Sequence, residues 1–199
     1  MTPADFPFER VRAVVIGASA GGVQALAALL PRLPASLEAP CFIVLHLPRE
    51  RPSLLAGIFG PKCARPFREA TDKEPVEPGT VYVAPPDYHL LIDQGPLLAL
   101  STDDAVHYSR PSIDVLFESA ADVYGDGLLG IILTGWNEDG AAGLAAVHRA
   151  GGLTIVQQPD TAEAPVMPQS ALERSPVQCV LDLDGIGEIL GQLTPRRRP

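Results

Sequence analysis

Short continuous apolar runs alternate along the chain with longer stretches in which apolar residues recur at helical spacing. The run at 11–16 is rich in β-branched residues, and the segment at 21–33 that follows repeats Ala and Leu at the period of a helix and closes at two prolines. Uninterrupted apolar runs are typical of parallel strands buried on both faces. Further strands are predicted over 41–45, 64–69, 128–133 and 153–156, and further helices over 53–59, 113–124, 141–149, 167–172 and 186–193.

The middle of the chain has a different pattern. The segment 79–101 places two short apolar runs on either side of Pro85-Pro86-Asp87 and a third run after a Gly-Pro turn, which predicts an antiparallel meander. Elsewhere strands alternate with helices, which predicts an α/β fold. We therefore expect a doubly wound, mostly parallel, Rossmann-like sheet with an added antiparallel meander, and a ligand crevice at the carboxyl ends of its strands.

The length and net charge of the chain limit its domain organisation and the kinds of partner it can bind. The 199 residues suit one domain, 1–199, with its core at about 11–193, and 46% hydrophobic residues suffice for a buried core. A formal net charge of −9 disfavours nucleic acid as a partner, because phosphate binding needs a basic face. The three arginines at 196–198 are interpreted as a solvated end of the chain.

Cysteine usage and hydropathy indicate the compartment. Cys41, Cys63 and Cys179 are odd in number and widely spaced, which disfavours a disulfide framework or a zinc site and favours a reducing cytoplasm. The first ten residues have no signal-peptide pattern. The nearly uncharged stretch 13–30 includes Ser19, Gln24 and three glycines, so we do not expect it to enter a membrane.

Ser19 is the first candidate for chemistry. Residues 17–21 read Gly-Ala-Ser-Ala-Gly between a predicted strand and helix, a pattern that can present a nucleophilic hydroxyl on a sharp turn. The alternative is that Ser19 only caps the helix. A nucleotide-binding regulator is disfavoured, because the chain lacks the dinucleotide glycine fingerprint and a phosphate-binding lysine at this turn.

His46 and Asp139 each follow another predicted strand. A serine needs a base to become nucleophilic, and a histidine needs a carboxylate to fix its tautomer. The alternatives are a structural histidine, an aspartate that caps the next helix, and Glu138 as the carboxylate. We expect Ser19 Oγ within reach of His46 and His46 within reach of Asp139, with looser geometry when no substrate is bound.

Several sequence motifs together resemble the catalytic domain of the chemotaxis protein-glutamate methylesterase family (CheB-type). The resemblance extends from about 11 to 193, nearly the whole chain. Its markers are IGASAGG at 16–22, LHLP at 45–48, VYVAPPDYHLLI at 81–92, RPSIDVLF at 110–117, GIILTGWNEDGAAGL at 130–144 and MPQSAL at 167–172.

The resemblance implies an enzyme that removes methyl groups from glutamyl methyl esters on the cytoplasmic helices of methyl-accepting chemoreceptors. Ser19 would be the nucleophile, His46 the general base and then acid, and Asp139 the carboxylate that orients His46. Backbone N–H groups near Ala20 and Trp136 are candidates for the oxyanion hole and substrate contact. No cofactor and no metal are expected.

The family also implies alternatives and a domain arrangement. Some members deamidate receptor glutamines, and a catalytically weak module that binds receptor arrays is the alternative from another class. Full-length members carry an amino-terminal receiver domain. We expect none in this chain, and therefore no control by phosphorylation within it.

The sequence departs from the familiar family pattern at three places. Trp136-Asn137-Glu138 replaces Met-Gly-Asn before the aspartate, Ala20 stands where threonine is common, and Ser109 stands where histidine often precedes the RPS motif. These changes bear on substrate choice and rate. His89 and His107 show no metal-ligand spacing and are interpreted as surface or packing residues, and Arg110 and Asp114 are candidates for a local ion pair.

Overall fold

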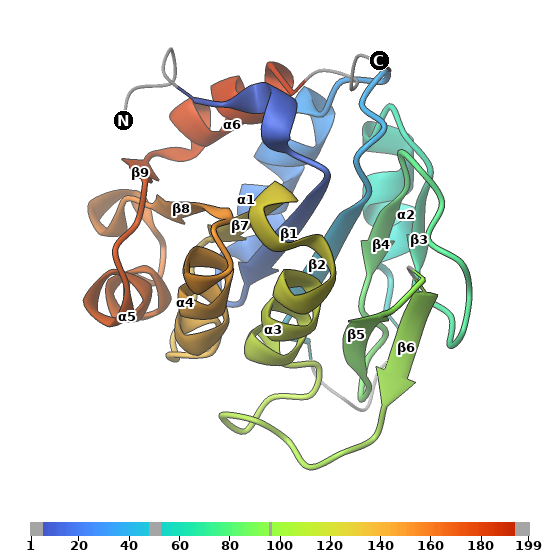
Figure 1. The fold of residues 1–199 in the computed structure, drawn as a ribbon. Coiled ribbons are helices and arrows are strands. Elements are labelled where there is room, and N and C mark those ends of the chain that lie inside the picture. Colours follow the sequence, from blue (N-terminus) through green and yellow to red (C-terminus); the bar gives the residue numbers. More distant parts are fainter. Residues whose placement is uncertain (1–5, 48–52, 96, 194–199) are drawn as a thin grey trace.

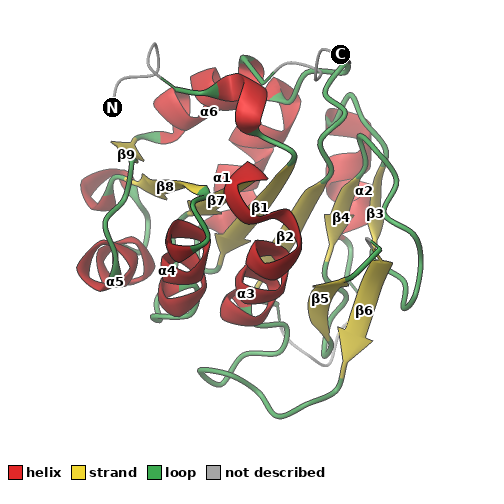
Figure 2. Cartoon of the chain, in the orientation of Figure 1, coloured by secondary structure: helices red, strands yellow, loops and turns green. Residues whose placement is uncertain are grey.

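A central sheet of seven parallel strands is covered by helices on both faces (Figures 1 and 2). The computed structural model describes residues 6–47, 53–95 and 97–193. The strand order is β3-β4-β2-β1-β7-β8-β9, and β5 and β6 form a separate antiparallel pair. The strands are β1 (Ala13–Ala18), β2 (Cys41–Leu45), β3 (Phe67–Glu69), β4 (Val81–Val83), β5 (His89–Asp93), β6 (Leu97–Ser101), β7 (Leu128–Ile132), β8 (Leu153–Gln157) and β9 (Cys179–Leu181).

Two hydrophobic clusters lie on opposite faces of this sheet. Alternate residues of β1 enter each cluster: Val14 and Ile16 pack on one side, Ala13 and Val15 on the other. This double burial explains why the strand sequence is apolar throughout. The first cluster includes helices α1 (Gly22–Leu29), α2 (Leu55–Phe59) and α6 (Leu183–Gly191), and the second includes α3 (Ile113–Tyr124), α4 (Ala141–Arg149), α5 (Val166–Arg174) and the β5-β6 pair.

The predicted α/β class, with its mostly parallel sheet, is confirmed. The bounds of β2, α3 and α4 are those expected, and Ser112 caps α3 as expected, its Oγ accepting a hydrogen bond from Val115 N at 3.5 Å. Among the described helices, none combines the length and apolar character needed to cross a bilayer. The arginine tail at 196–198 lies outside the described residues.

The predicted meander is only partly correct. Among the described residues, the antiparallel sheet is the two-stranded β5-β6 hairpin, whereas β4 lies in the parallel sheet between β3 and β2. All three residues of β4 are buried, so its apolar run reflects a position inside the sheet. The short edge strand β9 was not predicted, because three residues carry too little pattern.

The order in which the chain adds strands to the sheet reverses at β1. The chain passes from β1 to β2 on one side and later returns to place β7 on the other side. A crevice at the carboxyl ends of the strands forms at such a switch point and is the usual ligand site of this fold class.

Candidate active site

Ser19, His46 and Asp139 follow the three central strands β1, β2 and β7. The segments that follow these strands are joined to each other by backbone hydrogen bonds. His46 N donates to Ala18 O at 3.1 Å, just beyond the β1–β2 pairing. On the other side of β1, Ser19 N donates to Thr134 O at 2.9 Å. The backbone therefore brings the Ser19 turn, the end of β2 and the loop after β7 to one edge of the sheet.

The Ser19 turn is tight and is braced by the β7 loop. Gly21 has a φ of +76°, a conformation that favours glycine, and it is the N-cap of α1 without a side-chain hydrogen bond. The helix-cap interpretation of Ser19 is therefore wrong. Thr134 Oγ1 donates to Ala20 O at 2.8 Å, and a Cβ at Gly135 would lie 3.0 Å from Ser19 Cβ. Ser19 Oγ makes no hydrogen bond to any described residue, which leaves its hydroxyl available.

His46 and Asp139 form the central polar contact. His46 Nε2 lies 2.8 Å from Asp139 Oδ2, and the two side chains are 12% and 0% exposed. Asp139 also accepts hydrogen bonds from Ser112 Oγ at 2.8 Å, Ile113 N at 2.7 Å and Asp114 N at 3.0 Å. Burial alone would raise the pKa of Asp139, but the hydrogen bonds from His46 and the two backbone amides outweigh it, so the pKa is lowered. Because an ionised carboxylate only accepts, Nε2 is the donor in this contact, and in the neutral imidazole Nδ1 is the nitrogen with the lone pair.

The second imidazole nitrogen faces a serine from another loop. His46 Nδ1 lies 3.4 Å from Ser109 Oγ, which also accepts a hydrogen bond from Asn137 Nδ2 at 3.4 Å. Within the described parts of the chain, no hydrogen bond joins Ser19 to His46. Of the two predicted contacts, the structure shows the hydrogen bond between His46 and Asp139. The predicted hydrogen bond between Ser19 Oγ and His46 is not formed between these two described residues. Catalytic hydrogen bonds are often looser without substrate.

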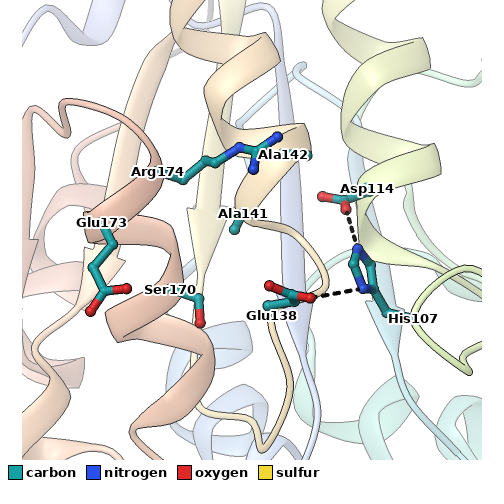
Figure 3. Close-up of a pocket in the computed structure, with 8 residues that line it drawn as sticks. All are labelled: His107, Asp114, Glu138, Ala141, Ala142, Ser170, Glu173 and Arg174. Atoms are coloured by element: carbon teal, nitrogen blue, oxygen red, sulfur yellow. Dashed lines mark ion pairs between the residues drawn. The ribbon is translucent and has the colours of Figure 1, made fainter.

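The alternative carboxylate has a different partner. Glu138 Oε1 lies 3.3 Å from His107 Nδ1, and His107 Nε2 lies 3.5 Å from Asp114 Oδ2 (Figure 3). Of the two neighbouring acids, Asp139 is the one that contacts the His46 imidazole. Asp139 is not the N-cap of α4 either, since Gly140, with a φ of +98°, holds that position.

The expected pair between Arg110 and Asp114 is wrong. Arg110 instead pairs with Asp87, its Nη2 lying 2.8 Å from Asp87 Oδ1. Asp114 turns toward α4, where Oδ1 accepts from Gly140 N at 2.9 Å and Gly143 N at 2.6 Å. This contact between two helices has no local sequence signal, so sequence reasoning missed the role of Asp114.

Two backbone donors follow Ser19 and Gly135 in the chain, and a Cβ added at Gly135 would lie 3.0 Å from Ser19 Cβ. The N–H groups of Ala20 and Trp136 make no hydrogen bond to a described residue. Trp136 is 65% exposed and lies in the same loop between β7 and α4 as Asp139. No group of three His, Cys, Asp or Glu in the described ranges is arranged to hold a metal ion. The arrangement therefore offers a hydroxyl, a base oriented by a carboxylate, and free amides, which are the parts used in acyl transfer.

Comparisons with known proteins agree on one family. The family model described as CheB methylesterase matches residues 14–190. A relative from Leptospira interrogans, provisionally named a protein-glutamate methylesterase/protein-glutamine glutaminase, is 46% identical over 181 residues, which cover 91% of this chain and 94% of that protein. A relative from Symbiobacterium thermophilum, named protein-glutamate methylesterase/protein-glutamine glutaminase, is 40% identical over 179 residues, and the matched part spans 49% of its length.

A solved structure has the same fold. The crystal structure of the Thermotoga maritima CheB methylesterase catalytic domain superposes with a TM-score of 0.87 at 34% sequence identity. The match covers 92% of this chain and 98% of that domain. The sheet and its helices are therefore shared almost completely.

Proposed function

Because the chain belongs to the CheB methylesterase family, we propose that it is a serine hydrolase that removes methyl groups from glutamyl methyl esters of chemoreceptors. The observation that carries the proposal is the 2.8 Å contact between His46 Nε2 and buried Asp139 Oδ2, at the sheet edge to which the backbone also brings the Ser19 turn. The same chemistry applied to a glutamine side chain gives deamidation, and the names of the relatives include both activities.

The acylation step uses Ser19 and His46. Ser19 Oγ attacks the ester carbonyl while His46 Nδ1 takes the hydroxyl proton, and Asp139 stabilises the imidazolium that forms. The developing oxyanion accepts hydrogen bonds from the Ala20 and Trp136 N–H groups. When the tetrahedral intermediate collapses, His46 returns the proton to the departing oxygen and methanol leaves.

Deacylation repeats the sequence with water. His46 takes a proton from a water molecule, which attacks the glutamyl-serine ester, and the released products are a receptor glutamate and free Ser19. A glutamine substrate would lose ammonia in the first step instead of methanol. Both reactions need the same residues and no cofactor.

The partner follows from the family. We propose the cytoplasmic helices of methyl-accepting chemoreceptors as the substrate, reached in the cytoplasm, with exposed Trp136 at the rim contacting the helix that presents the ester. That residues 1–199 form one catalytic domain stays a prediction.

The test is methanol release from a methylated receptor. Ser19→Ala is expected to lower kcat by roughly 10⁴-fold or more, because the nucleophile is removed. Ser109→Ala serves as the comparison, since Ser109 also lies beside His46, and its loss is expected to cost less than about 10-fold by removing one weak contact. Ammonia release from a receptor that carries glutamine measures deamidation.

Two outcomes would contradict the assignment. If Ser19→Ala releases methanol as fast as the parent, Ser19 is not the nucleophile. If the parent binds receptor but releases neither methanol nor ammonia, the array-binding module becomes the better description.

A further inference from the structure

We propose that Asp114 is a positioning residue that holds Asp139 against His46. Its activity test rests on the proposed hydrolase function. The structural basis is that the carboxylate associated with each of two helices accepts hydrogen bonds from the start of the other helix, an arrangement called the carboxylate exchange below. Asp139 lies just before α4 but accepts hydrogen bonds from Ile113 N and Asp114 N at the start of α3. Asp114 lies in the first turn of α3 but accepts from Gly140 N and Gly143 N at the start of α4.

The exchange fixes the backbone next to Asp139. Gly140 directly follows Asp139, and its N–H is held by Asp114 Oδ1 at 2.9 Å. The Asp139 side chain is held in turn by the α3 amides, so the segment is anchored through both its backbone and its carboxylate. Without the Asp114 carboxylate, the Gly140 peptide loses its acceptor and the segment can shift away from His46.

Glycines make the close crossing possible. A Cβ on Gly143 would lie 2.6 Å from Phe117 Cβ and 3.0 Å from Asp114 Cα. A Cβ on Gly140 would lie 2.5 Å from Ile132 Cδ1. The two helix starts therefore approach each other closely enough for each to bind the carboxylate of the other.

Asp114 is held from its second oxygen as well. Asp114 Oδ2 lies 3.5 Å from His107 Nε2, and His107 Nδ1 lies 3.3 Å from Glu138 Oε1 (Figure 3). This chain of contacts borders a cavity of about 310 Å³ between α3, α4 and α5, with Ser170 and Arg174 on its far side. The Asp114 side chain is 7% exposed although it forms no pair with a lysine or arginine among the described residues. Burying a carboxylate costs free energy of folding unless hydrogen bonds stabilise it. Here those hydrogen bonds come from Gly140, which directly follows Asp139, and from Gly143.

Asp114→Ala and Asp114→Asn separate positioning from a general structural role. Alanine removes both acceptor bonds. One amide oxygen of asparagine can accept from both Gly140 N and Gly143 N, as Oδ1 does. Asp122→Asn is the matched control, because Asp122 is exposed on the same helix and its side chain makes no hydrogen bond to a described residue. We expect kcat to fall about 10- to 100-fold in Asp114→Ala, and to stay within about 3-fold of the parent in Asp114→Asn and Asp122→Asn.

A second readout does not depend on turnover. The ¹⁵N signals of the His46 imidazole report which ring nitrogen carries the proton. We expect the Nε2–H form in the parent, Asp114→Asn and Asp122→Asn, and a mixture of tautomers in Asp114→Ala. If the parent releases no methanol, the proposed function fails while this measurement still decides the role of Asp114.

Three results would overturn the proposal. One is a folded Asp114→Ala protein with parental kcat and parental ¹⁵N signals. Another is a folded Asp114→Asn protein that loses more than about 100-fold in kcat with its His46 signals unchanged, which would assign the role to charge. Should Asp114→Ala fail to fold, Asp114→Glu replaces it, since it moves the carboxylate by one methylene, and parental kcat in that variant would also overturn the proposal.

Discussion

The Asp139 carboxylate is fully buried and surrounded by donors. His46 Nε2, Ser112 Oγ and the amides of Ile113 and Asp114 all point at its two oxygens. Burial by itself would raise the pKa of Asp139, and the hydrogen bonds from His46 and from the amides of Ile113 and Asp114 lower it instead. The native structure therefore binds the ionised form of Asp139 more tightly than the unfolded chain does.

Asp139→Asn tests this preference through stability. At pH 7 we expect the free energy of unfolding to fall by roughly 2 to 4 kcal/mol, because buried donors lose a charged acceptor. A carboxylate with a lowered native pKa contributes stability above its unfolded pKa of about 3.9, and this contribution is lost as the pH falls through the native pKa. The difference between parent and variant, measured by urea unfolding, should therefore be full above about pH 5 and shrink below about pH 4.

The control for this experiment is Asp122→Asn, whose exposed side chain should change stability by less than about 0.5 kcal/mol. A difference between parent and Asp139→Asn that stays constant from pH 7 to pH 3 would mean that the ionised form of Asp139 is not favoured by folding.

Single residues show where sequence reasoning stops. Ser19, His46 and Asp139 could be selected because each follows a continuous apolar run, and a parallel sheet gathers strand ends. The choice between Asp139 and Glu138 could not be made, because adjacent acids differ only in the direction of their side chains. The role of Asp114 was missed for a related reason, since its acceptor bonds reach another helix about 26 residues away.

The starts of α3 and α4 act as one structural unit. Each helix begins on a carboxylate supplied by the other, and the crossing is close because Gly143 faces Phe117 and Asp114. The helix bounds themselves were predictable from the 3.6-residue period and from Ser112 as a cap. Their mutual approach was not, because a glycine within a helix gives no indication of what lies opposite it.

Gly143→Ala measures how closely the helices pack. Alanine usually stabilises a helix relative to glycine, but here the added Cβ would lie 2.6 Å from Phe117 Cβ. We expect the free energy of unfolding to fall by roughly 1 to 3 kcal/mol. Gly57 in α2 is the matched control, because a Cβ there meets nothing within 4 Å, so Gly57→Ala should stabilise by about 0.5 to 1 kcal/mol.

Thermal or urea unfolding of both variants checks this prediction. Equal stabilisation of Gly143→Ala and Gly57→Ala would show that the α3–α4 crossing has spare room.

Neighbouring strands at the centre of the sheet come from parts of the chain that lie far apart in sequence. Strands β2, β1 and β7 occupy its centre, with β7 more than a hundred residues after β1. The alternation of strands and helices predicted a parallel sheet but not this order, nor the place of β4 within it, since strand pairing depends on contacts between distant segments. A core built from such distant pairings should open as a unit.

Cys41 is a probe of that cooperativity. It is buried at the start of central strand β2, and burial, with a smaller contribution from Cys63, raises the pKa of its thiol above the ordinary range. We expect Cys41 to react with a thiol reagent only when the whole domain unfolds, so that its labelling free energy equals the global unfolding free energy within about 1 kcal/mol. Site-resolved mass spectrometry across a urea series provides the measurement.

Cys63 provides an internal comparison in the same experiment, because it is half-buried outside the strands. Its labelling should be faster and depend less on urea. Labelling of Cys41 at the rate of Cys63 would mean that β2 opens locally.

The exchanged aspartates also set a condition for moving this chemistry to another protein. By sequence Asp139 belongs with α4 and Asp114 with α3, but each carboxylate is bound by the other helix. A graft that carried only the loop after β7 into a new α/β scaffold would bring Asp139 without the amides that hold it. Holding Asp139 in a new scaffold therefore requires both discontinuous segments, 109–124 and 134–149, in addition to the segments that carry Ser19 and His46.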